Sequence, residues 1–160
     1  MTERVGLFLD VQNIYYTVRD GFSGQFDYNK FWRKVVNEDI QLVTAIAYAI
    51  DRGDQKQIQF QNILRGIGFK VKLKPYITRS DGSAKGDWDV GITIDMLESS
   101  DSIDRYILLS GDGDMSMLVD KLISKGKTVE VYGVKKLTAD SLIKSATNFI
   151  AIDESLLIKR

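Results

Sequence analysis

Short apolar runs alternate along the chain with longer segments in which apolar residues recur at helical spacing. Runs of this length, nearly unbroken in apolar character, are typical of strands that are covered on both faces of a sheet. The predicted buried strands are residues 5–9, 42–50, 105–109, 128–132 and 149–152. Residues 69–75 instead alternate apolar and basic side chains, which predicts a half-exposed strand.

Helices are predicted between these strands, and the clearest stripe is Met115, Leu118, Val119 and Leu122. The other predicted helices carry residues 31–36 after an Asp27 cap, about 13 residues after Asp54, a segment opened by Gly86 or Asp87, and residues 137–145. The helix after Asp54 is predicted to turn Ile58, Ile63 and Leu64 inward. The helix opened by Gly86 or Asp87 is predicted to carry Val90, Ile94 and Leu97 on its apolar face. Residues around Tyr15 and Tyr16 are expected to form a short helix or loop, and residues 78–86 a loop.

Strands that alternate with helices predict an α/β fold, Rossmann-like, with a mostly parallel, doubly wound central sheet and helices on both faces. We expect one domain over residues 1–153, followed by a short tail over residues 154–160. The segment from Ser110 to Asp114, S-G-D-G-D, lies where a strand turns into a helix, the edge at which such sheets bind ligands. Asp112 and Asp114 are close enough in sequence to share a hard cation, although an Asp at this position is also a common helix cap.

The composition excludes several classes of catalytic and metal-binding site. The chain has 160 residues, 44% of them hydrophobic, with 22 Lys+Arg against 22 Asp+Glu and no Cys or His. Absence of His and Cys excludes Ser-His and Cys-His nucleophiles, thiolate or imidazole zinc sites and disulfides. Balanced charge gives no global field that favours nucleic acid. The first residues show no leader pattern and no apolar stretch could span a membrane, so we expect a soluble, cytoplasmic protein without a membrane partner.

Acids at strand ends are the remaining candidate chemistry, since phosphate-loop, dinucleotide-binding and G-x-S-x-G motifs are absent. Asp10 ends the first strand, and Asp89 falls in the first turn of a predicted helix. Singly, Asp10 is explained as a turn residue and Asp89 as an acid that complements a helix dipole. If the strands of Asp10 and Ser110 are neighbours, the acids share one crevice and favour Mg²⁺ or Mn²⁺, with no organic cofactor.

Three motifs in order resemble the NYN domain, in its LabA-like branch of the PIN-like nuclease superfamily. They are D-V-Q-N at 10–13, K-G-D-W-D-V at 85–90 with Asp95 after it, and S-G-D-G-D at 110–114, and the closing pattern Ser141-Leu142, Ala146 and Phe149 also fits. The resemblance implies a three-layer PIN-like fold and a Mg²⁺- or Mn²⁺-dependent ribonuclease. It implies that the catalytic and metal-binding acids are Asp10, Asp89, Asp112 and Asp114, and that Asn13, Lys85 and Ser110 bind substrate. Asp95 is a secondary candidate, and Asp87 is better explained as a helix cap.

Substrate contacts are predicted beside the acids. Basic and aromatic candidates are Lys70, Lys72, Lys74, Arg79, Lys135 and Lys136, and Tyr15, Tyr16, Tyr76 and Trp88. The lysine triplet is equally typical of a solvated edge strand that avoids aggregation. The main hypothesis is an endoribonuclease, and the alternative is an RNA-binding or regulatory module that keeps the acids but has little activity. A receiver domain and a phosphomonoesterase would each need a second acid that pairs with Asp10, and this sequence has none in the required position. The RNA target, the number of metal ions and the oligomeric state, a homodimer included, stay open.

Overall fold

The computed structural model describes residues 2–75, 77–78, 84–85 and 87–159. For residues 75, 77–78 and 84–85 it describes the backbone alone, so the side chain of Lys85 lies outside the described set, as do Tyr76 and Arg79 entirely.

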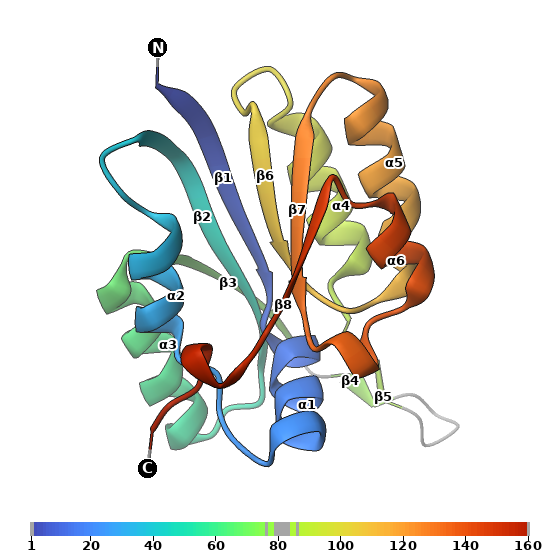
Figure 1. Ribbon diagram of the computed structural model, residues 1–160. Coiled ribbons are helices and arrows are strands. Elements are labelled where there is room, and N and C mark those ends of the chain that lie inside the picture. The colour runs from blue at the N-terminus through green and yellow to red at the C-terminus, as the bar shows by residue number, and fades with distance from the viewer. Residues whose placement is uncertain (1, 76, 79–83, 86, 160) are drawn as a thin grey trace.

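One parallel sheet of six strands forms the centre of the molecule, in the order β3-β2-β1-β6-β7-β8 (Figure 1). The strands are β1 Glu3–Asp10, β2 Ile40–Asp51, β3 Lys70–Pro75, β6 Arg105–Leu109, β7 Thr128–Gly133 and β8 Asn148–Ala151. Every predicted strand is therefore present, and the predicted α/β architecture with a parallel sheet is confirmed. The basic strand, β3, lies at one edge, which agrees with its half-exposed pattern.

Sequence order reverses between β1 and β6, because β2 and β3 extend the sheet to one side of β1 and β6 to β8 extend it to the other. The two strands pair in register from Val5 opposite Arg105 to Leu9 opposite Leu109. Asp10 and Ser110 consequently leave the sheet side by side. In an open α/β sheet, this reversal point at the carboxyl ends is where a ligand crevice forms.

Helices cover both faces of the sheet (Figure 1). One face carries α1 Val11–Phe22, α2 Tyr28–Val35 and α3 Gln55–Ile67, and the other carries α4 Asp89–Glu98, α5 Ser116–Ser124 and α6 Asp140–Ser145. Each face buries its own apolar cluster, and the stripe from Met115 to Leu122 is fully buried as predicted. Asp27 and Asp54 cap α2 and α3 by accepting hydrogen bonds from Lys30 N and Gln57 N.

Two predicted helix faces are wrong. In α4 the buried residues are Ile92 and Met96, whereas Val90 is 71% and Ile94 49% exposed. In α3, Leu64 is buried as predicted, but Ile58 and Ile63 are exposed. Both helices offer more than one apolar stripe at 3.6-residue spacing, and the angle at which each helix leaves its strand decides which stripe meets the sheet.

Three local predictions are also corrected. The segment containing Tyr15 and Tyr16 is a full helix, α1. A 3₁₀ turn, Lys135–Leu137, precedes α6, which begins only at Asp140. The predicted loop over 78–86 contains strand β5, Ala84–Lys85, which pairs antiparallel with β4, Ile77–Thr78.

Residues beyond 153, predicted as a tail, form a 3₁₀ turn, Glu154–Leu156, and bury Leu156 and Leu157 against the α1–α3 face. Lys30 Nζ donates a hydrogen bond to the carbonyl of Leu157. No helix in the described part of the chain is both long and apolar enough to cross a membrane.

Candidate metal centre

The loop from Ser110 to Asp114 is held at the carboxyl end of β6 by hydrogen bonds to the first turn of α1. Gly111 N donates to Asn13 Oδ1 at 2.8 Å, and Ser110 Oγ lies 3.5 Å from Asp10 Oδ2, at the outer limit of hydrogen bonding. Asp112 N in turn donates to Ser110 Oγ at 3.2 Å. The D-x-x-N and S-G-D-G-D motifs are therefore parts of one hydrogen-bonded unit.

Within that loop, Asp112 acts as a cap and still presents carboxylate oxygen to the crevice. Its Oδ1 accepts a hydrogen bond from Asp114 N at 2.9 Å, at the start of a 3₁₀ turn, Gly113–Met115. Its role as a cap therefore explains Asp112 in part. Capping does not account for Asp114, which is exposed, because the cap residues of this turn and of α5 are Asp112 and Met115.

The two glycines of the loop are needed because another segment passes against the loop backbone. A Cβ on Gly111 would lie 2.9 Å from the carbonyl oxygen of Leu137, and one on Gly113 would lie 2.9 Å from the Cβ of Ala139. Ala139 N also donates to the Gly111 carbonyl at 3.1 Å. The close approach of the segment from Leu137 to Ala139, rather than positive φ, therefore explains both glycines.

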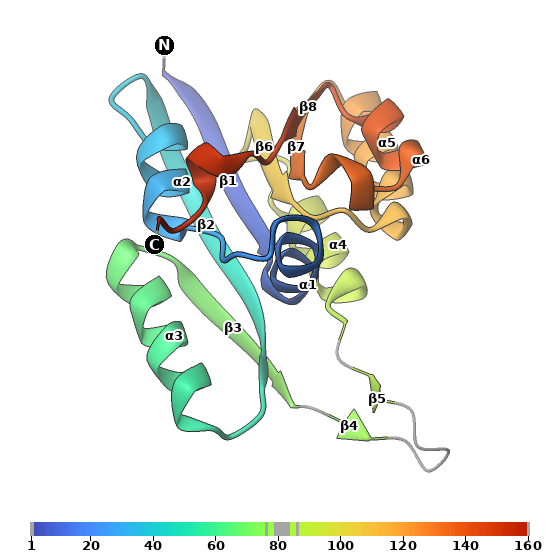
Figure 2. The same ribbon diagram turned by 60° about the horizontal axis from the view of Figure 1, so that its bottom comes forward.

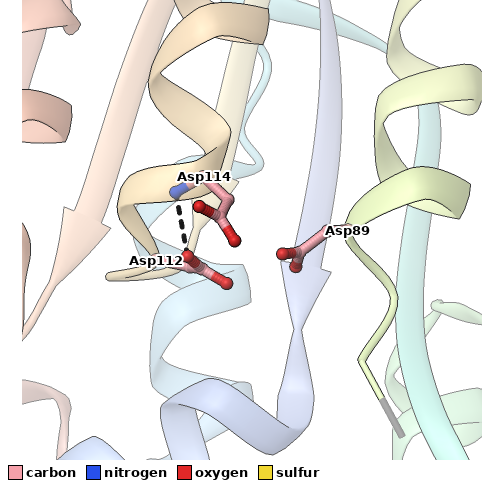
Figure 3. A group of neighbouring side chains, drawn as sticks. All are labelled: Asp89, Asp112 and Asp114. Carbon is pink, nitrogen blue, oxygen red and sulfur yellow. Dashed lines mark hydrogen bonds between the residues drawn. The ribbon is translucent and has the colours of Figure 1, made fainter. Parts of the chain in front are cut away.

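Asp89 approaches the same loop from the first turn of α4. Figure 3 shows its carboxylate facing those of Asp112 and Asp114, and one oxygen from each of the three lies within 4.8 Å of the others. Asp89 Oδ1 is buried and has no hydrogen-bond partner among the described residues. A buried carboxylate oxygen without a donor is costly, and a hard cation among oxygen ligands would satisfy it.

Trp88 fixes where α4 begins and so where Asp89 lies. Its indole Nε1 donates to the carbonyl of Ala49 at 2.8 Å, and its ring packs on Tyr48 with centroids 5.2 Å apart. Lys74 Nζ lies 5.5 Å from the centre of the same ring and donates to the Asp87 carbonyl. Trp88 thus anchors α4 to β2, and its predicted role as a surface for base stacking stays a prediction.

Crowding of the acids changes their protonation. Burial, followed by the hydrogen bond and charge of Asp112, raises the pKa of Asp89 to about 7. Burial also raises the pKa of Asp10 to about 6, against the backbone hydrogen bond from Asn13, and the charge of Asp112 adds to the increase. Near neutral pH the metal-free cluster therefore holds protons that a bound cation would displace.

Asp10 lies beneath the three-acid cluster formed by Asp89, Asp112 and Asp114. It is 6% exposed and caps α1 by accepting from Asn13 N at 3.4 Å. It does not belong to the set within 4.8 Å. Its charge nevertheless acts on Asp89, as do the charges of Asp112 and Asp87.

The remaining predicted site residues separate into two groups. Asn13 and Ser110 lie at the crevice, where the contacts described for them hold the loop. Asp95 lies elsewhere, because Lys72 Nζ is 2.6 Å from its Oδ2 and Tyr48 OH donates to the same oxygen at 2.8 Å. Lys72 is thus an internal partner of Asp95. Asp87 accepts a long hydrogen bond from Asp89 N at 3.4 Å, although the cap residue of α4 is Trp88.

Comparison with known proteins gives one family. Residues 4–153 match the NYN domain. The low amplitude and bright protein LabA of Synechococcus elongatus is 26% identical over 159 residues, which cover 94% of this chain and 84% of that protein. A crystal structure of a Vibrio parahaemolyticus protein of unknown function superimposes with a TM-score of 0.93 and 52% identity, over 98% of this chain and 97% of the other.

Proposed function

Since this chain belongs to the NYN domain family, we propose that it is a metal-dependent ribonuclease that hydrolyses RNA phosphodiesters. The observation that carries the proposal is the meeting of Asp89, Asp112 and Asp114 at the point where the strand order reverses (Figure 3). The proposal depends on the family and on this geometry.

The residues present fit a divalent cation. All the donors are carboxylate oxygens, which Mg²⁺ and Mn²⁺ prefer, and one of them, Asp89 Oδ1, is buried with no hydrogen-bond partner among the residues that the structure describes. In this proposal the three-acid cluster holds the ion, and Asp10 adds charge from beneath. A bound cation supplies Lewis-acid stabilisation of the phosphodiester oxygens and lowers the pKa of an attacking water.

The other roles belong to side chains that position the acids or meet the strand of RNA. Ser110 and Asn13 keep Asp112 facing the crevice, and we place both at its substrate side. Lys85 is proposed to contact a phosphate, because it precedes the acids in the K-G-D-W-D motif. Asp89 and Asp10 must lose their protons for the site to be fully charged, so metal affinity should increase as pH rises through about 6 to 7.

A cleavage assay with Asp112→Asn tests the proposal. Labelled single-stranded RNA and the matching DNA are incubated with protein and Mn²⁺, Mg²⁺ or EDTA. The matched control is Asp120→Asn, which removes an exposed acid of α5 outside the three-acid cluster. We expect wild type and Asp120→Asn to cut RNA only with metal, and Asp112→Asn to be inactive while it stays folded.

Two other outcomes are informative. If Mn²⁺ raises the melting temperature of wild type but not of Asp112→Asn and no RNA is cut, the site binds metal and the protein is the RNA-binding or regulatory module. If metal changes neither the melting temperature nor the cleavage of RNA, the acids have only a structural role and the proposal is wrong.

A further inference from the structure

A cavity of about 510 Å³ opens beside the carboxyl end of β2, on the face of the sheet opposite α4 and α5. Residues of α1 and α3 line it, and Figure 2 shows these two helices on either side of the end of β2. None of the three-acid cluster lines it, so it is distinct from the metal centre. Its volume is in the range of sites that hold small organic ligands.

Aromatic rings form much of the cavity wall. Tyr15 and Tyr16 come from α1, Tyr28 begins α2, and Phe60 comes from α3. The Tyr28 and Phe60 centroids are 5.7 Å apart. At the mouth, Tyr15 is 55% and Ile63 56% exposed, so apolar surface is left in contact with water. Such a wall favours a flat, apolar group.

Polar groups at the cavity specify the ligand further. Gln12 and Gln57 bring side-chain amides, which donate and accept hydrogen bonds, and Arg52 and Lys56 bring positive charge. Arg52 Nη2 donates to Tyr16 OH at 3.4 Å. Asp27, the one acid among the lining residues that the structure describes, is already engaged as the cap of α2. A flat ring with hydrogen-bonding edges and an attached anion, as in a nucleotide, matches this set.

The cavity and the metal centre meet at the same edge of the sheet. Val11, which lines the cavity, directly follows Asp10. Ala49 also lines it, and the carbonyl of Ala49 accepts the hydrogen bond from Trp88, the residue before Asp89. Burial and the charge of Asp10 raise the pKa of Tyr28, which places the cavity wall within electrostatic range of that acid. One strand of RNA can therefore touch both places.

We propose that this cavity binds one nucleobase of an RNA strand whose neighbouring phosphodiester lies at the three-acid cluster. The inference rests on the proposed ribonuclease function, and it adds a base-binding subsite to it. A free nucleotide shares the same chemistry, and the experiment below separates the two sources.

Binding of short single-stranded RNA is measured by fluorescence anisotropy in EDTA at low salt, so that no metal-dependent cleavage occurs. A series of oligonucleotides carries one abasic position each. The test variant is Ile63→Glu at the cavity mouth, and the control is Ile58→Glu, an exposed residue of the same helix that does not line the cavity. Both make the same charge change at an exposed site, so the difference between them reports the cavity.

We expect one abasic position to weaken binding to wild type and to Ile58→Glu by about tenfold, the usual scale for a stacked base. Ile63→Glu should bind all the oligonucleotides equally and weakly. Tyr15→Ala, which removes an exposed ring of the wall, should show a smaller loss of the same kind. If every abasic position is equivalent in wild type, or if Ile63→Glu keeps the dependence, the proposal is wrong.

The same oligonucleotides incubated with Mn²⁺ separate this inference from the proposed function. RNA that is cut without any base dependence would overturn the subsite and leave the nuclease. Base-dependent binding that Ile63→Glu removes, without cleavage under any metal, would support the base site and overturn the nuclease. Nucleoside 5′-monophosphates that bind wild type but not Ile63→Glu, and that fail to compete with RNA, would identify a free-nucleotide site and overturn the subsite.

Discussion

Helix α4 carries two acids whose surroundings are opposite. Asp95 Oδ2 is 2.6 Å from Lys72 Nζ and accepts a hydrogen bond from Tyr48 OH. Asp89, less than two turns earlier, faces two further carboxylates and has a buried oxygen without a hydrogen-bond partner in the described part of the chain. The first acid is neutralised inside the protein, whereas the second needs a proton or a cation from outside.

This difference separates an acid that stabilises the fold from one that the fold tolerates. A paired, partly buried carboxylate costs stability when its partner is removed. A carboxylate crowded by like charges costs stability while it is ionised, and such groups are concentrated at functional sites. Four predictions, from the largest expected effect to the smallest, test whether the two acids differ in this way.

The largest effect is expected in activity. Asp89→Asn should lower metal-dependent RNA cleavage by about 100-fold or more, the scale seen when one group that stabilises a transition state is removed. Asp95→Asn should keep cleavage within about threefold once the fraction of folded protein is allowed for. Initial rates with Mn²⁺ measure both. Equal losses in the two variants would end the distinction between the acids.

The free energy of unfolding should instead depend on Asp95. Asp95→Asn leaves Lys72 and Tyr48 without their charged acceptor, so we expect the free energy of unfolding to fall by about 2 kcal/mol. Glu98→Gln, an exposed acid on the same helix, should change it by less than about 0.5 kcal/mol. Urea denaturation in EDTA measures the three proteins. A loss in Asp95→Asn no greater than that in Glu98→Gln would show that the ion pair contributes nothing.

The pH dependence of stability gives a third test. The pKa of Asp89 is raised to about 7 in the folded protein, above the usual value of 3.8, so the folded state binds this proton more tightly. The stability that binding of this proton contributes is fully present below about pH 4 and is lost as pH rises to about 7. Asp89→Asn should remove part of that loss and gain about 1 kcal/mol at pH 8 in EDTA, less than the full shift implies because solvent screens the site.

Mn²⁺ supplies the matched comparison for this pH profile. At pH 8 the ion should stabilise wild type and leave Asp89→Asn nearly unchanged, because binding to the folded state alone raises the free energy of unfolding. Melting curves between pH 4 and 8, with and without Mn²⁺, measure both effects. A wild-type profile that is identical to that of Asp89→Asn in EDTA would contradict the crowding of the acids.

The cluster of acids was predictable from the sequence to the extent that it depends on strand ends. Asp10 and the S-G-D-G-D loop each follow an apolar run, and parallel strands end at one edge, so their meeting needed only β1 and β6 to be neighbours. Asp89 is a candidate from its place in the first turn of a predicted helix, and the NYN resemblance supports it, but a helix position alone does not show where its carboxylate lies. Its approach to the cluster depends on Trp88 and on the exact start of α4.

Features that join distant segments were not predictable. Lys72 on β3 meets Asp95 on α4 only because β3 pairs with β2 in one register, and the alternating pattern of β3 reads equally well as a solvated edge. The sequence also predicts the wrong inward faces for α3 and α4, because each helix contains competing apolar stripes. The cavity beside β2 collects residues from α1, α2, β2 and α3, and no single stretch of sequence marks it.

The smallest effect concerns Trp88, the anchor that directly precedes Asp89. Trp88→Phe keeps an aromatic ring against Tyr48 but loses the hydrogen bond from Nε1 to the Ala49 carbonyl, so we expect a loss of about 1 kcal/mol in stability. Because that bond sets the start of α4, the concentration of Mn²⁺ needed for half-maximal stabilisation should rise about threefold or more, while Asp95 and its ion pair are unaffected. Val90→Ala, an exposed change two residues on, is the control. Unchanged metal affinity in Trp88→Phe, together with the stability loss, would show that the anchor supports the helix without positioning Asp89.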